Sequence, residues 1–164
     1  MAVEIRAVVI TASDACASGH RSDESGETLV RLLEESNAVV VEKLILADDL
    51  EPLVANLVKF SERNDVNLIV TTGGTGLGPR DNTPEATLRV IEREVPGVAE
   101  AMRAESLKVT KMAMISRGVC GVRSETLIIN LPGSPKAVKE SFAVIAPVLS
   151  HALDLLAGKT THRA

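Results

Sequence analysis

The sequence predicts an α/β fold, a three-layer sandwich in which a mostly parallel central sheet is covered by helices on both faces. Two observations predict it. Apolar, β-branched runs alternate with stretches whose apolar residues recur at helical period. Polar and glycine-rich segments follow these apolar runs directly, where strands would end. Ligands of such folds bind beyond the carboxyl ends of the strands, so these segments are candidate site loops.

In the first half of the chain, strand and helix patterns alternate twice. Leu29, Leu32 and Leu33 keep the i, i+3, i+4 spacing of an amphipathic helix. Asp48 and Asp49 precede a second helical period, and since Asp is a good N-cap, one can start this helix while the other faces the site. The predicted elements are strands over residues 5–11 and 39–46, a polar loop over 12–26, and helices over 27–35 and 50–58.

In the second half, proline and glycine mark the helix ends. Thr83 is the expected N-cap of a helix with Pro84 at its first position, and Pro96 ends it. Pro147 predicts a break or kink in the last helical stretch, and Gly158 ends that stretch. The predicted elements are strands over 68–72, 119–122 and 126–130, and helices over 83–94, 98–109 and 135–156, while 112–118 has no clear pattern.

Length and composition are those of one globular domain over residues 1–164, with 45% hydrophobic residues to form its core. The net charge of -4, without a Lys/Arg-rich run, argues against a nucleic-acid partner. The chain has two Phe, no Tyr and no Trp, so a ring-shaped ligand would lie against aliphatic side chains, Pro, Gly and backbone.

The expected location is cytoplasmic, with no membrane partner. The N-terminus lacks the pattern of a signal peptide, and no apolar run approaches membrane length. Cys16 and Cys120 stand far apart in the sequence, which fits neither a disulfide scaffold nor a zinc site. Two free thiols in a reducing compartment are therefore expected.

Residues 71–86 form a glycine-rich segment between a strand end and a helix start. Glycine lets a ligand approach the backbone N–H groups, and a helix N-terminus favours anions. Two known motifs do not fit. The phosphate loop requires Gly-Lys-Ser/Thr, but Pro79 and Arg80 follow Gly78, and the glycine spacing is not that of the dinucleotide fingerprint. The segment predicts a phosphate cradle of another kind; a plain flexible connection is the alternative.

Charged residues in these loops are candidate ligands. Asp48 and Asp81 follow neighbouring strands and could share a Mg²⁺ that also holds phosphate oxygens, or could serve only the helix termini. Arg80 and Arg117 could pair with an anion or lie exposed on the surface. The polar loop that begins with Ser13 could cover a ligand or be an ordinary surface loop.

Taken together, these segments resemble the MogA/MoaB-like molybdopterin-binding family of molybdenum-cofactor biosynthesis, whose domain also occurs in fusion proteins such as gephyrin. The matching segments occur in family order over essentially the whole chain. They are Ser13-Asp14, Ser18-Gly19, 23–26, Asp48-Asp49, 72–76, 80–86, Ser116-Arg117 and 130–135.

The resemblance implies a molybdopterin adenylyltransferase, which transfers AMP from ATP to the terminal phosphate of molybdopterin and releases pyrophosphate. It implies that Asp48 and Asp81 are the catalytic acids and the ligands of Mg²⁺. Family members often have Pro before the first aspartate; here Ala47 stands there, so Asp49 remains open as the functional acid. The implied substrate- and nucleotide-binding residues are Ser13, Asp14, Thr72, Gly73, Gly74, Thr75, Gly76, Arg80, Thr83, Pro132, Gly133 and Ser134.

The resemblance also implies a homotrimer, and transfer of the product to a separate MoeA-type protein that inserts molybdate. The alternative function is a MoaB-like protein that binds molybdopterin without adenylyl transfer. Retention of both acidic positions favours the enzyme. A nicotinamide-dependent dehydrogenase is a poorer hypothesis, because the fingerprint spacing is missing.

Overall fold

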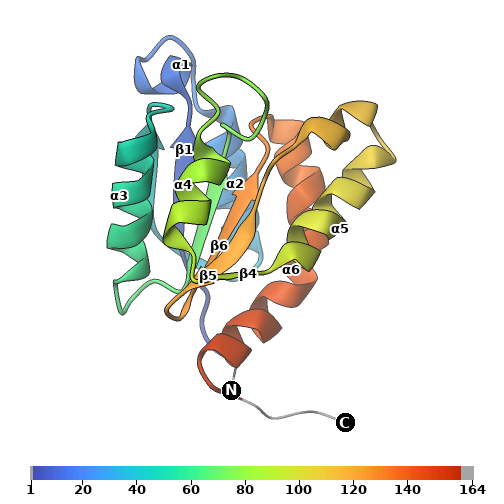
Figure 1. The fold of residues 1–164 in the computed structure, drawn as a ribbon. Coiled ribbons are helices and arrows are strands. Elements are labelled where there is room, and N and C mark those ends of the chain that lie inside the picture. The colour runs from blue at the N-terminus through green and yellow to red at the C-terminus, as the bar shows by residue number, and fades with distance from the viewer. Residues whose placement is uncertain (1, 160–164) are drawn as a thin grey trace.

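The central layer is one sheet of six strands, in the order β2-β1-β3-β6-β5-β4 (Figure 1). In the computed structural model, which describes residues 2–159, strands β2, β1, β3 and β6 run parallel, and β5 and β4 run antiparallel to their neighbours. The predicted, mostly parallel sheet is therefore confirmed. The strands are β1 (Arg6–Ala12), β2 (Val39–Leu46), β3 (Leu68–Thr72), β4 (Arg93–Glu94), β5 (Cys120–Arg123) and β6 (Thr126–Leu131).

Helices cover both faces of the sheet, as the sequence predicts. Because side chains of a strand alternate, Ala7 and Val9 of β1 pack toward α2 and α6, whereas Val8 and Ile10 pack toward α3 and α4. Helix α5 packs beside α6 (Figure 1). The helices are α1 (Asp14–Ala17), α2 (Glu24–Glu35), α3 (Leu50–Ser61), α4 (Thr83–Val90), α5 (Pro96–Leu107) and α6 (Pro135–Leu156), with a 3₁₀-helix η1 (Lys111–Ile115).

Two helix starts differ from the prediction. Helix α2 begins three residues earlier than expected, because the carboxylate of Asp23 caps it and accepts from Gly26 N at 2.9 Å. The prediction that Thr83 is the N-cap of α4 was wrong. Asn82 holds that position, and Thr83 is the first helical residue. The Thr83 hydroxyl bonds the glycine-rich loop instead of its own helix.

The region after Val90 also differs. Helix α4 ends there, four residues early, because Glu92 N and Val95 N donate to carbonyls of β5 at 2.8 Å each and form the edge strand β4. Pro96 then begins α5 rather than only ending α4. The predicted short strand over 119–122 corresponds to β5.

The last helix, α6, runs without a break through Pro147. A proline inside a helix loses one hydrogen bond. Ile145 and Leu149, on either side of it, are buried against α2, α5 and the sheet, and this packing offsets the loss. Gly158 follows the helix with φ +71°, as a terminating glycine should.

Both cysteines are free and buried, as predicted. Burial raises the pKa of the Cys120 thiol to about 12, so it stays protonated at neutral pH. Within residues 2–159, no helix combines the length and apolar character needed to cross a membrane.

Candidate functional site

The predicted site loops meet at the carboxyl edge of the parallel strands. The loop after β3 and the segment around α1 lie together at the top of the sheet in Figure 1. Ser13 N donates to Leu46 O at 2.9 Å, and Gly73 N donates to Leu131 O at 3.2 Å. These two bonds fix the loops after β1 and β3 to the ends of β2 and β6, so four neighbouring strands share one polar edge.

The glycine loop (residues 73–78) passes very close to its surroundings. Gly73 has φ +92° and Gly74 has φ +64°, a region that favours glycine. A Cβ on Gly73 would lie 2.3 Å from Ala12 O, and a Cβ on Gly74 would lie 2.4 Å from Thr83 Oγ1 and 3.1 Å from Asp48 Oδ1. Glycine is required here by close approach, which argues against a plain flexible connection.

Two threonine residues hold this loop in place through hydrogen bonds to backbone carbonyl groups. Thr83 Oγ1 donates to Gly73 O at 3.0 Å, and Thr83 N donates to Gly74 O at 3.2 Å. Thr72 Oγ1 donates to Pro132 O at 2.8 Å and so joins the loops after β3 and β6. Thr72, Thr83 and Pro132 are brought together as predicted, with both threonine side chains acting as supports of the loops.

Three amide groups in the middle of the loop, in contrast, are unpaired among the described residues. Among the described residues, the N–H groups of Gly74, Thr75 and Gly76 have no protein acceptor. A row of free amides at the start of α4 is an arrangement that binds phosphate oxygens.

Asp48 has one carboxylate oxygen engaged and one free. Its Oδ2 accepts from Asp14 N at 2.9 Å, whereas its Oδ1 is buried without a hydrogen-bond partner in the described chain. Burial raises the pKa of Asp48, and the nearby charges of Asp14 and Asp81 raise it further; the bond from Asp14 N and the charge of Arg80 oppose this. A buried carboxylate oxygen without a partner is what a ligand or cation would satisfy.

Arg80 lies across the acidic residues. Its Nε and Nη2 donate to Asp14 at 2.5 and 2.8 Å, and Nη2 also reaches Asp49 Oδ1 at 2.9 Å. The hydrogen bonds from Arg80 lower the pKa of Asp14 to about 2. Asp49 occupies the N-cap position of α3 but makes no side-chain cap bond, so its carboxylate serves Arg80 while the carboxylate of Asp48 faces Gly74.

Asp81 lies inside the curve of the glycine loop. Its Oδ2 accepts from Gly78 N at 2.7 Å and would contact a Cβ on Gly76 at 2.9 Å. Within residues 2–159, no cluster of three or more His, Cys, Asp or Glu is arranged to hold a metal ion. Asp48 and Asp81 lie close enough for the charge of Asp81 to raise the pKa of Asp48.

Arg117 is placed differently from either sequence expectation. It is neither a free anion partner nor an exposed surface residue, because its Nε and Nη2 donate at 2.7 Å each to Gly76 O and Asp81 O, and Arg117 N donates to Thr75 O at 2.9 Å. Its Nη1 pairs with Glu85 of α4, and these bonds lower the pKa of that carboxyl group. Arg117 thus clamps the glycine loop by its carbonyl groups.

The first polar loop is mostly structural. Ser13 Oγ caps α1 and accepts from Cys16 N at 3.3 Å. The buried Asp23 accepts from Thr11 Oγ1 at 2.8 Å and pairs with Lys43 at 3.1 Å. Burial raises the pKa of Asp23, but these partners and the Gly26 amide outweigh it and leave the pKa low. Asp14 of this loop joins the other acidic residues through its bonds with Asp48 and Arg80.

The turn after β6 forms the opposite side of the site. A Cβ on Gly133 would lie 3.1 Å from the Cα of Gly73, so the two loops touch at their glycines. Ser134 Oγ accepts from Ala137 N at 3.2 Å and caps α6, as predicted.

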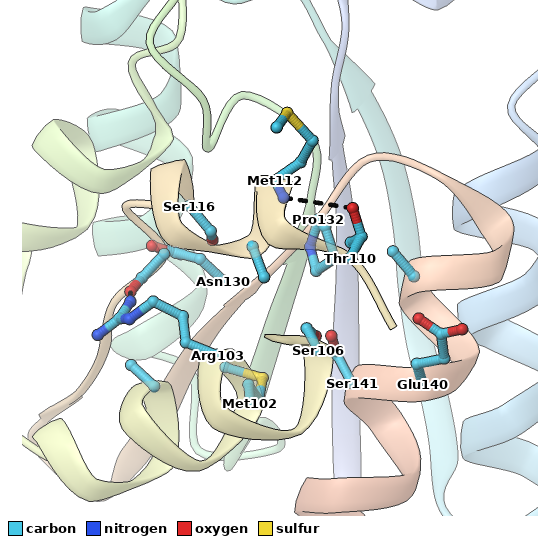
Figure 2. Close-up of a pocket in the computed structure, with 14 residues that line it drawn as sticks. Met102, Arg103, Ser106, Thr110, Met112, Ser116, Asn130, Pro132, Glu140 and Ser141 are labelled. Carbon is cyan, nitrogen blue, oxygen red and sulfur yellow. Dashed lines mark hydrogen bonds between the residues drawn. The ribbon is translucent and has the colours of Figure 1, made fainter. Parts of the chain in front are cut away.

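A cavity of about 200 Å³ adjoins this turn, between α5, η1 and α6 (Figure 2). Met102 gives it an apolar wall, and Asn130 and Pro132 form its side toward the glycine loop. The sequence prediction missed this cavity, because its lining comes from parts of the sequence that are far apart: α5 with η1, the end of β6, and α6. The near absence of aromatic residues is the one signal in the sequence, and it predicts that a ring would lie against aliphatic side chains, Pro, Gly and backbone.

The fold and site define an α/β protein with a glycine loop flanked by carboxylates, an arrangement suited to phosphorylated ligands. The chain belongs to the family described as "Probable molybdopterin binding domain", which matches residues 8–151. This confirms the family resemblance of the sequence motifs.

Proteins of about the length of this chain and much longer proteins are both similar to it. A molybdopterin adenylyltransferase of Helicobacter pylori is 39% identical over 152 residues, which cover 92% of this chain and 86% of that protein. The molybdenum cofactor synthesis protein cinnamon of Drosophila melanogaster is 43% identical over 150 residues; the match covers 90% of this chain but only 25% of that protein.

Comparison with solved structures supports the same family. The molybdopterin biosynthesis enzyme MoaB of Thermus thermophilus superposes with a TM-score of 0.88 at 44% identity, covering 94% of this chain and 98% of that one.

Proposed function

We propose that this protein is a molybdopterin adenylyltransferase, which transfers AMP from ATP to the terminal phosphate of molybdopterin and so acts in molybdenum-cofactor biosynthesis. The observation that carries the proposal is the buried, unpartnered Oδ1 of Asp48, which faces Gly74 beside three free loop amides. The names of the relatives support the reaction.

In this reaction, a terminal phosphate oxygen of molybdopterin attacks the α-phosphorus of ATP, and the bond to the leaving pyrophosphate breaks. Such transfers need positioning and charge stabilisation more than a covalent catalyst. The N–H groups of Gly74, Thr75 and Gly76 would donate to phosphate oxygens and stabilise the charge that develops on them. Arg117 and Thr83 hold these amides in place through the loop carbonyls.

Arg80 would exchange partners when the nucleotide binds. It pairs with Asp14 and Asp49 through side chains that are about half exposed, an arrangement that costs little to open. A phosphate group offers the same fork of acceptor oxygens as a carboxylate. Arg80 can therefore move from these aspartates to the triphosphate without a change in the fold.

The residues present fit a magnesium ion that arrives with the nucleotide. Mg²⁺ is typically bound by one or two carboxylates together with substrate phosphates. Asp48, whose Oδ1 lacks a partner, and Asp81 would supply these carboxylates. When bound, the ion would neutralise charge on the phosphates.

The cavity beside Asn130 suits a fused nitrogen heterocycle, such as the ring of the pterin or of adenine. Met102 gives it an apolar wall, and polar groups of Arg103 and Ser106 lie at its edge (Figure 2). Pockets for such ligands combine apolar walls with a few polar groups that fix orientation.

We further propose a cytoplasmic homotrimer that passes its product to a MoeA-type insertion protein. An apolar groove of about 270 Å³ between β5, α5 and α6 supports self-association. Val148 and Leu155, which line it, are about half exposed in the single chain. Light scattering should give three times the monomer mass; a monomer would contradict this part of the proposal.

The decisive experiment combines wild-type protein with molybdopterin and Mg-ATP and measures adenylylated molybdopterin and pyrophosphate. Asp48→Asn and Asp81→Asn should each retain molybdopterin binding and lose most of the transfer. If the wild-type protein binds molybdopterin but forms no adenylylated product, the MoaB-like binding function holds instead.

A further inference from the structure

A buried chain of hydrogen bonds connects the cavity to the glycine loop. Asn130, at the end of β6, donates from Nδ2 to Thr87 Oγ1 at 2.9 Å. Thr87 Oγ1 in turn donates to Thr83 O at 2.9 Å. Thr83 Oγ1 donates to Gly73 O at 3.0 Å, and Thr83 N donates to Gly74 O at 3.2 Å. Asn130, Thr87 and Thr83 are each at most 1% exposed.

The two ends of this chain lie at different parts of the site. Asn130 lines the cavity between α5, η1 and α6 (Figure 2), whereas Gly73 and Gly74 belong to the proposed phosphate cradle. Thr87, in the middle of α4, contacts neither. It is buried completely, yet its hydroxyl both accepts from Asn130 and donates to Thr83.

A second hydrogen bond of Asn130 ends in strand β3, before the glycine loop begins. Its Nδ2 also donates to Thr71 Oγ1 at 3.0 Å, and its Oδ1 accepts from Val119 N at 3.1 Å. Thr71 lies within β3, and its hydroxyl accepts this one bond. Thr71 and Thr87 therefore supply equivalent buried acceptors to the same amide group. Of the two hydroxyl groups, that of Thr87 donates a further hydrogen bond, to Thr83 O.

The space that the Thr71 and Thr87 side chains occupy could be filled without hydroxyl groups. Valine has nearly the shape of threonine and is less costly to bury, because a buried hydroxyl must find partners. A buried polar network whose members are all satisfied fixes one arrangement of the elements it joins. This network joins the end of β6, helix α4 and the glycine loop.

We propose that Thr87 is a positioning residue, which holds the glycine loop at a fixed offset from the cavity wall at Asn130. This proposal rests on the proposed function: the ring of one ligand lies in the cavity while its phosphate lies on the loop, so the offset between them sets the alignment of the reacting groups. A small misplacement of reacting groups costs large factors in rate.

The test compares three variants: Thr87→Val, Thr87→Ser and Thr71→Val. Both valine variants leave one Asn130 N–H without an acceptor, so their melting temperatures should fall by similar amounts. Thr87→Val should lower kcat on the order of tenfold to a hundredfold, with KM for ATP and molybdopterin within about twofold. Thr87→Ser should restore kcat to within about threefold, and Thr71→Val should stay within about threefold of wild type.

Equal losses of kcat in Thr87→Val and Thr71→Val, or no rescue by serine, would overturn the proposal. A second readout is independent of activity. The amides of Gly73 and Thr83, bonded to Leu131 O and Gly74 O, report on the loop by hydrogen exchange. They should exchange faster in Thr87→Val than in Thr71→Val; equal rates would contradict the positioning role. If the wild-type protein shows no transfer, the proposed function fails, and exchange alone decides the role of Thr87.

Discussion

Asp14 and Asp48 each bind the backbone of the other. Asp14 N donates to Asp48 Oδ2 at 2.9 Å, and Asp48 N donates to Asp14 Oδ1 at 3.0 Å. This reciprocal pair joins the loops after β1 and β2 and fixes the rotamer of Asp48, so that its Oδ1 stays buried and free. Asp14 bears the bonds from Arg80, which leaves Asp48 as the carboxylate available to a ligand or cation.

The first prediction concerns the stability cost of Asp48. Its pKa is raised in the folded protein, so folding favours the protonated form, and ionised Asp48 destabilises the fold at pH values above that pKa. Asp48→Asn should therefore raise the melting temperature at pH 7 while lowering adenylyl transfer by a hundredfold or more, roughly the loss seen when one charge-stabilising group is removed.

The gain in melting temperature should shrink as the pH falls through the native pKa of Asp48, because the wild-type carboxyl group then becomes neutral as well. Thermal unfolding of both proteins from about pH 4, near the ordinary carboxyl pKa, up to about pH 8 measures this. A lower melting temperature of the variant than of the wild type at pH 7 would contradict the inference that ionised Asp48 destabilises the fold.

The second prediction concerns the clamp on the glycine loop. Arg117→Ala removes the Glu85 pair and the bonds to Gly76 O and Asp81 O, so it should destabilise the fold by about 1–3 kcal/mol and lower transfer. Arg89→Ala is the control: it breaks the exposed pair with Glu51 and should cost about 0–1 kcal/mol with normal transfer. Urea unfolding gives both values, and equal losses would mean that the clamp adds nothing.

The third prediction concerns the backbone of Gly73. Gly73→Ala places a Cβ 2.3 Å from Ala12 O at φ +92°, and main chain cannot yield as a flexible side chain can. We expect a loss of at least about 1–3 kcal/mol in unfolding free energy.

The matched control is Gly97→Ala, in the first turn of α5, where a Cβ meets nothing within 4 Å. It should be neutral or stabilise by about 0.4–1 kcal/mol. A Gly73→Ala protein as stable as Gly97→Ala would show that the loop has room for a side chain.

The fourth prediction concerns which ligand, molybdopterin or AMP, places its ring in the cavity between α5, η1 and α6. Ala99 is buried and lines the cavity beside Met102, so Ala99→Leu should fill part of this space. Calorimetry with molybdopterin and with AMP, measured separately, should show weaker binding for the one ligand whose ring enters the cavity and unchanged binding for the other. Unchanged affinity for both would place both rings elsewhere. Folding of the variant is checked by its melting temperature.

The sheet and the site loops could be predicted from the sequence because both depend on local patterns. Strand β3 begins with the apolar run Leu68-Ile69-Val70, and glycines follow it at the positions where the backbone takes positive φ. Edge strand β4 could not be predicted, since Arg93 and Glu94 carry no strand pattern and are defined only by their pairing with β5. The sequence singled out Arg117 as an anion partner but not as a clamp on the loop, and it did not single out Thr87, for the same reason: their roles depend on partners 30 or more residues away or on burial.

The acidity of the site edge has a consequence for selectivity. Asp14, Asp48, Asp49 and Asp81 surround the loop together with Arg80, and Arg117, which is paired with Glu85, adds a second cation; these five carboxylates and two guanidinium groups leave a formal charge of -3. Amides alone would attract any small anion, including inorganic phosphate. These negative charges repel such competitors. A polyphosphate with a bound cation therefore binds in preference to the same polyphosphate without a cation.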